Sequence, residues 1–224
     1  MLDRQNKIII KDTEGSGGEN TYIVTKDNGK ISLSSKASGT TVPEEQITQY
    51  DGYLVTEFCE QAEYIHNIFP RATNTFRILT FRNHAGDVFV PAVVHRIGSS
   101  KTAPLDSFSQ GGLSAWVDRS SGELGKAAEP VSGEKPEWHP DTGVCIEGET
   151  IPGWRELLLD MKTIAGQLPE MTYVGWDVVV TGPGTFKIIE ANSHPNPRVI
   201  QVHRPLLKEE SVRNFFEYYG LGSR

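Results

Sequence analysis

Runs of β-branched residues recur along the first quarter of the chain, separated by polar and glycine-rich stretches. Runs of this kind predict strands. In this part of the chain they are predicted for residues 7–10, 21–25, 31–34 and 53–58. The stretch between the first two runs contains Gly15, Gly17 and Gly18, and it predicts a flexible loop that joins two strands.

Two short helices are expected near these strands. Pro43, followed by Glu44 and Glu45, suits a helix start, because proline is preorganised for the first helical position and acidic residues favour the first turn. A second helix is predicted over residues 60–68, and Pro70 ends it.

Strands also dominate the rest of the chain. They are predicted for residues 75–82, 87–96, 113–118, 173–181 and 185–191. Apolar residues three and four apart predict an amphipathic helix over residues 153–168, and a last helix is predicted around residues 206–219. Residues 119–150 are rich in glycine, serine, proline and charge, and predict a long functional loop. The mixed order and the excess of strands predict an α+β fold.

The composition narrows the possible functions. Of 224 residues, 37% are hydrophobic and 23% charged, so the chain can bury a core. The formal net charge of −7 argues against unspecific binding to nucleic acid, but a few focused cations can still hold an anionic ligand. Given the polar N-terminus and the short apolar runs, neither a signal peptide nor a membrane span is expected in this sequence. Cys59 and Cys145 are too few for a disulfide framework, so a soluble cytoplasmic protein is expected.

The predicted hairpin near the C-terminus carries the clearest chemistry. Its turn centres on Pro183 and Gly184. A symmetric hairpin with this centre places Asp177 directly opposite Glu190, with Cβ atoms about 5 Å apart. Asn192 lies two residues beyond Glu190 and therefore points to the same face.

Opposed carboxylates destabilise a sheet unless something neutralises them. Asp177, Glu190 and Asn192 supply hard oxygen ligands that suit Mg²⁺, or Mn²⁺, together with the oxygens of a phosphate. Glu190 would then bridge two ions. An exposed hairpin with an acidic face is the alternative. The apolar residues beside the acids favour a buried central hairpin instead, where unpaired carboxylates are costly. Glycoside hydrolysis fits poorly, because no apolar pocket that would raise one carboxyl pKa is evident.

Six motifs in order resemble the sugar-transfer-associated family of the ATP-grasp superfamily. They are NTFRI (74–78), DSFSQGGL (106–113), HPDTG (139–143), IPGW (151–154), GWD (175–177) and EAN (190–192). The resemblance extends from Lys11 to about His203. It implies an ATP-grasp fold in which two α+β subdomains clasp the nucleotide. Residues 1–70 would form the small lid subdomain and residues 71–224 the large subdomain with the metal site.

The resemblance also implies roles for residues of the small subdomain. Lys11 would reach an ATP phosphate, and Gly15, Gly17 and Gly18 would let backbone N–H groups approach the phosphates. The strand around residues 54–58 would form the hinge against adenine. A surface lysine and an ordinary flexible loop are the alternatives for the first two features.

Within that hinge, the backbone would read the base edge beside Phe58, with Glu57 as a partner of the base or ribose. Arg77 and Arg96 would neutralise phosphate and acylphosphate oxygens, because a guanidinium is planar and permanently charged. An arginine in a β-branched strand is either exposed or a ligand, so an exposed surface arginine is the alternative for both.

The activity implied is that of an ATP-dependent ligase that joins a carboxylate to an amine or thiol through an acylphosphate. The substrates would be small molecules, including sugar-linked ones, in polysaccharide or cell-surface biosynthesis. A phosphotransferase on the same scaffold and a non-catalytic nucleotide-binding module remain as alternatives. ATP-grasp enzymes usually carry an N-terminal α/β domain before the position of Lys11. Only ten residues precede Lys11 here, so that domain is expected to be absent from this chain.

Overall fold

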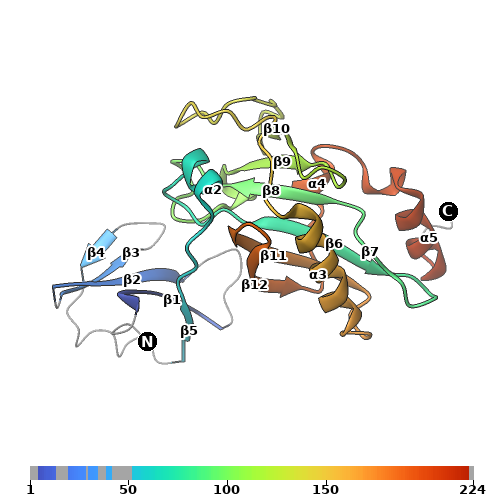
Figure 1. The fold of residues 1–224 in the computed structure, drawn as a ribbon, viewed down its shortest axis with the longest axis horizontal. Coiled ribbons are helices and arrows are strands. Elements are labelled where there is room, and N and C mark those ends of the chain that lie inside the picture. Colours follow the sequence, from blue (N-terminus) through green and yellow to red (C-terminus); the bar gives the residue numbers. More distant parts are fainter. Residues whose placement is uncertain (1–4, 14–19, 29, 35–38, 42–51, 222–224) are drawn as a thin grey trace.

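The computed structural model describes residues 5–13, 20–28, 30–34, 39–41 and 52–221 (Figure 1). Two antiparallel sheets lie side by side; the N-terminal strands form one sheet and the later strands form the other. The glycines at positions 15, 17 and 18 and the helix predicted after Pro43 lie outside the described residues. None of the helices in the described part is long and apolar enough to cross a membrane.

The small sheet has five strands in the order β4-β3-β2-β1-β5. These strands are β1 (Lys7–Lys11), β2 (Thr21–Asp27), β3 (Lys30–Ser34), β4 (Gly39–Thr41) and β5 (Leu54–Glu57). The strands predicted in this region are confirmed. Alternation along β1 buries Ile8 and Ile10 in the core of the small sheet. Ile9 and Lys11 therefore point to the other face, toward the large sheet.

The large sheet has seven strands. Six form the order β10-β9-β8-β6-β11-β12, and β7 pairs with β6 beside that path. The strands are β6 (Phe76–Arg82), β7 (Val88–Phe89), β8 (Val93–Ile97), β9 (Leu113–Val117), β10 (Leu124–Ala128), β11 (Tyr173–Gly182) and β12 (Thr185–Asn192). Two predictions were wrong in detail. Residues 87–96 form two strands rather than one, and the predicted loop 119–150 contains β10, which pairs with β9.

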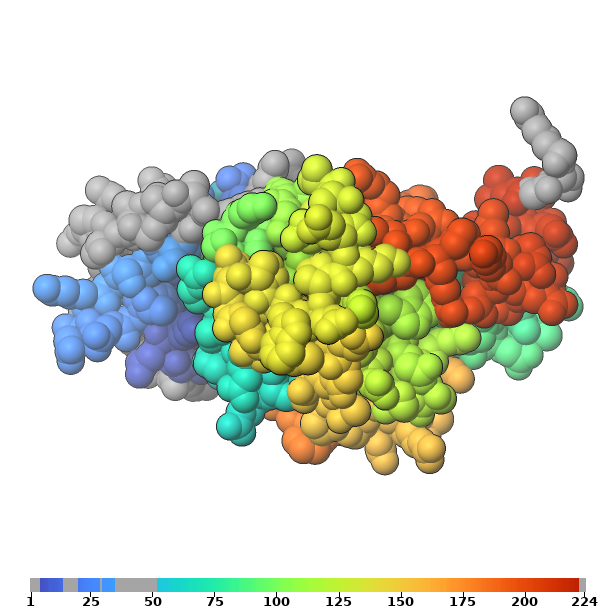
Figure 2. Space-filling model, turned by 90° about the horizontal axis from the view of Figure 1, so that it is seen from above, coloured from blue at the N-terminus to red at the C-terminus, as the bar shows by residue number. Residues whose placement is uncertain are grey.

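The helices cover both faces of the large sheet (Figure 1). They are α2 (Glu63–Ile68), η2 (Phe108–Gln110), α3 (Trp154–Gly166), α4 (Arg198–Gln201), η3 (Leu206–Lys208) and α5 (Glu210–Tyr218). The amphipathic helix predicted over residues 153–168 is confirmed as α3. The last predicted helix is broken into η3 and α5. Figure 2 shows these C-terminal helices at the end of the molecule opposite the small sheet.

Alternation along β6 separates two cores. Phe76 and Ile78 pack into the core under α2 and α3, whereas Leu79 and Phe81 pack into the core under α4 and α5. Arg77 shares a face with Leu79 and Phe81 but lies beyond the edge of that second core. One face of the large sheet is therefore apolar under the C-terminal helices and polar where it faces the small sheet.

The hairpin of β11 and β12 pairs Asp177 with Glu190, as predicted from the turn. The pairing is not that of a regular hairpin. Ile189 is an extra residue on β12, and Thr181 is an extra residue on β11. The two shifts run in opposite directions and cancel at the turn, which is why the symmetric prediction found the right pair.

The prediction of a buried central hairpin was only half right. Strand β11 is central and almost fully buried, but β12 is an edge strand of the described sheet and is largely exposed. Ile188 and Ile189, which suggested burial, are 37% and 40% exposed. Apolar side chains on an edge strand need a partner surface, and these two line the space between the two sheets.

The turn of this hairpin docks on the start of α3. Gly153 has a φ of 71°, and a Cβ added there would lie 2.0 Å from the Gly184 nitrogen. The Gly184 N–H also donates to the Pro152 carbonyl at 3.3 Å. The helix that covers one face of the sheet is thereby held against the turn of the hairpin.

This contact predicts a large effect of Gly153→Ala. A non-glycine residue at this φ costs about 1–2 kcal/mol, and the added methyl group must also displace the turn. We expect the free energy of unfolding, measured by urea denaturation, to fall by at least about 2 kcal/mol. Gly166→Ala is the matched control, because a Cβ there meets no atom within 4 Å, and it should stabilise by up to about 1 kcal/mol. Equal stability of the two variants would contradict the docking role.

One buried histidine, His95, and one partly buried histidine, His203, predict loss of stability in acid. Burial lowers the pKa of His95 to about 4, and burial also lowers that of His203 to about 4. The unfolded chain, with histidine pKa values near 6.5, therefore binds protons that the folded chain does not. The free energy of unfolding should fall as the pH drops from about 6.5 to about 4, by up to about 3 kcal/mol for each histidine. The melting temperature across that range measures it.

The variant His203→Gln should show a shallower fall of melting temperature with pH than the wild type. His66→Gln, which removes an exposed histidine, serves as the control and should keep the wild-type slope. An unchanged slope in His203→Gln would show that His203 does not contribute.

Candidate functional site

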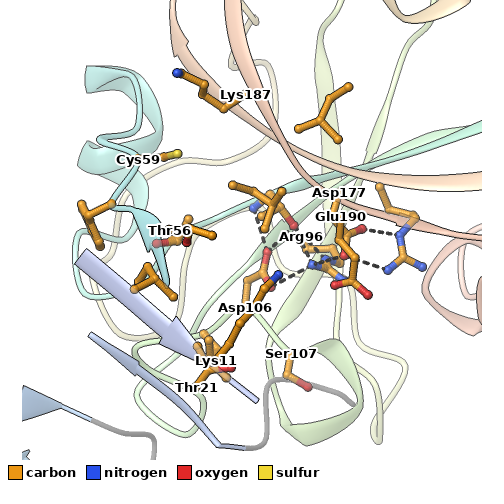
Figure 3. A pocket seen from close by; sticks show the side chains of 18 of the residues that line it. Lys11, Thr21, Thr56, Cys59, Arg96, Asp106, Ser107, Asp177, Lys187 and Glu190 are labelled. Atoms are coloured by element: carbon orange, nitrogen blue, oxygen red, sulfur yellow. Dashed lines mark hydrogen bonds and ion pairs between the residues drawn. The ribbon is translucent and has the colours of Figure 1, made fainter. Parts of the chain in front are cut away.

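A cleft of about 460 Å³ lies between the small sheet and the polar end of the large sheet (Figure 3). All described residues that the sequence singled out as site residues line it. They are Lys11, Glu57, Phe58, Arg77, Arg96, Asp177, Glu190 and Asn192. The first three come from the small sheet and its exit, and the other five come from β6, β8, β11 and β12 of the large sheet. The fold thus brings together residues that lie far apart in the sequence.

One wall of the cleft comes from the small sheet. Lys11 is the last residue of β1, and the alternation of that strand turns its side chain away from the core of the small sheet. Strand β5 pairs with β1 and ends at Glu57, so the hinge segment around Phe58 lies along the same wall. Lys7 sits over the Phe58 ring, 3.5 Å from its centroid, and covers one face of the ring.

An ion pair crosses from this wall to the other. Lys187 Nζ on β12 lies 2.6 Å from Glu57 Oε1 on β5. The hydrogen bond from Lys187 lowers the pKa of Glu57, and the hydrogen bond to Glu57 raises the pKa of Lys187. Both side chains are about half exposed, so the pair contributes little to stability in water. The Glu57 carboxylate, which directly precedes Phe58 in the hinge segment, is therefore paired with Lys187 in this structure.

The opposite wall is built around a buried ion pair. Arg77 and Asp177 are direct partners across β6 and β11. The guanidinium binds the carboxylate in a fork, with Nε 2.6 Å from Oδ1 and Nη2 3.1 Å from Oδ2. Their side chains are only 9% and 6% exposed. Arg77 was predicted to neutralise phosphate, and here it is committed first to holding Asp177.

Arg96 on β8 lies among three carboxylates (Figure 3). Its Nη2 is 3.1 Å from Asp106 Oδ1 and 3.2 Å from Asp177 Oδ2. Burial opposes the charged form of Arg96, but the charges of Asp106, Asp177 and Glu190 more than offset it. The pKa of Arg96 is therefore raised, and the guanidinium stays charged.

Thr75 and Asp106 also belong to this wall, and the sequence had not predicted them as site residues. Both are buried and both line the cleft. Asp106 Oδ2 accepts hydrogen bonds from the Thr75 N–H at 2.7 Å and from the Thr75 hydroxyl at 2.6 Å. They lie within two of the family motifs, but no local pattern connects two residues that are 31 positions apart.

Glu190 and Asn192 complete the wall. Glu190 is exposed and its carboxylate forms no hydrogen bond within the described part of the chain, so both carboxylate oxygens face the cleft or solvent. Asn192 donates through Nδ2 to the Gly175 carbonyl at 3.3 Å, which leaves its amide oxygen as the group available to a cation.

The donor set fits a hard cation if Asp177 can still accept one. A carboxylate has about four lone-pair sites. Arg77 donates one hydrogen bond to Oδ1 and one to Oδ2, and Arg96 forms an ion pair with Oδ2. A site on Oδ1 therefore remains, and Glu190 is the partner of Asp177 on β12. In the described residues, no cluster of three His, Cys, Asp or Glu side chains could hold a metal alone, so Asn192 and phosphate oxygens would be needed.

Another motif acts structurally. His139 is buried, stacks on Phe69 with ring centroids 4.8 Å apart, and lies 2.8 Å through Nε2 from the Gly98 carbonyl. Asp141 accepts from both the N–H and the hydroxyl of Ser100 at 2.7 Å. These contacts fasten the loop after β10 to the segment after β8, and neither His139 nor Asp141 lines the cleft.

Comparisons with known proteins place the chain. A protein-family model described as sugar-transfer associated ATP-grasp matches residues 1–214. No protein in a search of curated proteins matches the chain. Among solved structures, the chain is similar to a Chryseobacterium gregarium RiPP-associated ATP-grasp ligase in complex with ADP and a leader and core peptide. The identity is 11% and the TM-score 0.40, over 100% of this chain and 51% of that one, so this chain spans about half its length. Because the family model covers nearly the whole sequence, the chain belongs to the sugar-transfer associated ATP-grasp family.

Proposed function

We propose that the cleft binds Mg²⁺-ATP and that the chain supplies the nucleotide site of an ATP-dependent ligase. The ligase would join a carboxylate to an amine or thiol. The observation that carries the proposal is the cleft itself. Cationic and hinge residues of one sheet face carboxylates and arginines of the other across about 460 Å³. This volume lies in the range of small-molecule sites.

The two walls offer complementary surfaces for a nucleotide. Ile9 on one wall and Ile188 and Ile189 on the other are apolar side chains that can cover the faces of a base. The exposure of the two β12 isoleucines then has a reason, because a bound base would bury them. The hinge backbone beside Phe58 would bind the base edge, and Lys11, which lines the same cleft, would bind a phosphate.

The metal ligands in this proposal are Asp177, Glu190 and Asn192, with Mg²⁺ as the expected ion and Mn²⁺ as a substitute. When bound, Mg²⁺ would neutralise charge on the β and γ phosphate oxygens. The protein's own part is to hold Asp177 rigid through Arg77 and to keep Arg96 charged beside the reacting phosphoryl group.

The proposed reaction has two displacements. An oxygen of the substrate carboxylate attacks the γ phosphorus of ATP, the bond to the β–γ bridging oxygen breaks, and ADP leaves. An amine or thiol then attacks the acyl carbon, the bond to the phosphate oxygen breaks, and the nucleophile loses its proton. A carboxylate is already a nucleophile, so the first step depends on orientation and charge neutralisation. A role in polysaccharide or cell-surface biosynthesis, with sugar-linked substrates, accords with the family name.

Glu190→Gln is the sharpest test of the metal site. Glu190 is exposed and its carboxylate forms no hydrogen bond in the described part of the chain, so the fold should survive the change. We expect the Mg²⁺-dependent affinity for ATP, measured by isothermal titration calorimetry, to fall by at least about tenfold. The exposed Glu156→Gln on α3 is the matched control. Wild-type affinity in Glu190→Gln would exclude this residue as a metal ligand.

Asp177→Asn is less direct, because Asp177 neutralises two buried arginines. Its loss should also lower the free energy of unfolding, by about 3–5 kcal/mol, as for other broken buried pairs.

Hydroxylamine trapping tests the acylphosphate step. With Mg²⁺-ATP and a set of candidate carboxylates, the proposed ligase should release ADP and form a hydroxamate, because hydroxylamine takes the place of the amine. ADP release with a phosphorylated alcohol and no hydroxamate would indicate a phosphotransferase instead. Nucleotide binding without ADP release under any condition would indicate a binding module.

A further inference from the structure

Thr75 uses every polar group it has in one small region. Its N–H and its hydroxyl both donate to Asp106 Oδ2. Its carbonyl accepts from the Arg96 N–H at 2.7 Å. Its hydroxyl oxygen also accepts from the Arg96 side chain, from Nη2 at 2.7 Å and from Nε at 3.0 Å. Thr75 therefore ties the backbone of Arg96, the guanidinium of Arg96 and the carboxylate of Asp106 to one point.

These contacts determine the orientation of the guanidinium. The donors on Nε and Nη2 of Arg96 are directed to Thr75, Asp106 and Asp177, which are all buried. For Nη1, the structure shows no partner within the described residues. The Arg96 side chain is 16% exposed and lines the cleft. The guanidinium is thus fixed along one edge, and Nη1 remains as the donor for a ligand.

The place of Arg96 identifies which part of the ligand it meets. Asp177 and Glu190, the proposed metal ligands, both act on its charge. Cations held there would neutralise charge on the β and γ phosphate oxygens of a bound nucleotide. Arg96 would consequently lie beside the phosphoryl group that is transferred, and a planar donor in a fixed position is suited to the charge that develops on it.

We propose that Thr75 and Asp106 are positioning residues that aim Arg96 at the γ phosphate of ATP. Neither residue touches the nucleotide in this proposal; both act through the guanidinium. The inference rests on the proposed function, because it needs Mg²⁺-ATP in the cleft. It goes further by assigning a role to the residues that hold Arg96. Through Arg96, these residues would affect the affinity for ATP but not the affinity for ADP.

Thr75→Val is the first test, because it keeps the β-branched shape and removes only the hydroxyl. The two probes are ADP and a non-hydrolysable ATP analogue with an imido group between the β and γ phosphorus atoms, each with Mg²⁺. We expect the affinity for the analogue to fall by about 10- to 100-fold, since small misplacement of a positioned group has effects of this size. The affinity for ADP should change by less than about twofold, because ADP lacks the group that Arg96 meets.

Three comparisons separate positioning from a general loss of structure. Thr75→Ser should restore most of the affinity for the analogue, because it restores the hydroxyl. In an Arg96→Gln background, Thr75→Val should have no further effect, because the residue acts through Arg96. Thr80→Val removes a buried hydroxyl on β6 that accepts from Trp176 Nε1 at 2.7 Å on the opposite face. It should lower stability but not change affinity for either nucleotide.

Asp106→Asn provides the second variant. In this variant an amide NH₂ group can take the place of the oxygen that accepts the two hydrogen bonds from Thr75, and an NH₂ group cannot accept them. The affinity for the analogue should therefore again fall more, relative to wild type, than the affinity for ADP. Equal losses for ADP and the analogue in Thr75→Val, or additive losses with Arg96→Gln, would overturn the positioning role. If wild-type protein bound neither nucleotide, the proposed function would fail instead, and the two failures are therefore distinguishable.

Discussion

Burial of charge at the end of the large sheet is the constraint on which the cleft depends. Arg77, Arg96, Asp106 and Asp177 lie almost out of contact with solvent, and each would be costly there alone. They are tolerable because every carboxylate oxygen has at least one donor and each guanidinium has an acidic partner. The network has little freedom to move one member without exposing the others. The network forms a rigid wall of the cleft, and Lys11 and the hinge segment of the small sheet form the opposite wall.

The topology of the large sheet explains how such a wall is assembled. Strands β8, β6 and β11 are neighbours, so Arg96, Arg77 and Asp177 come from adjacent strands although Arg77 and Asp177 are 100 positions apart. The same face becomes apolar two residues later along β6, where Leu79 begins the core beneath the C-terminal helices. Strand alternation therefore provides both the polar wall of the cleft and the apolar support behind it.

Much of this arrangement was accessible from the sequence, for reasons that can be named. Local period-two patterns located the strands, and the turn at Pro183 and Gly184 gave the pairing of Asp177 with Glu190. The edge position of β12 was not accessible, since sheet order is set by contacts between distant segments. Ile188 and Ile189 look like core residues in a sequence and are instead residues of the cleft wall. The roles of Thr75 and Asp106 were hidden for the same reason, because their link exists only after folding.

The irregular pairing of the β11–β12 hairpin also affects whether the protein can associate with other copies of itself. An edge strand with apolar side chains is a template on which another chain can add a strand. In β12 the extra residue Ile189 breaks the regular ladder, and Lys187 and Glu190 place charges on either side of the two isoleucines. Bulges and charges of this kind discourage edge-to-edge association. The strand that forms part of the cleft wall is in this way also protected against aggregation.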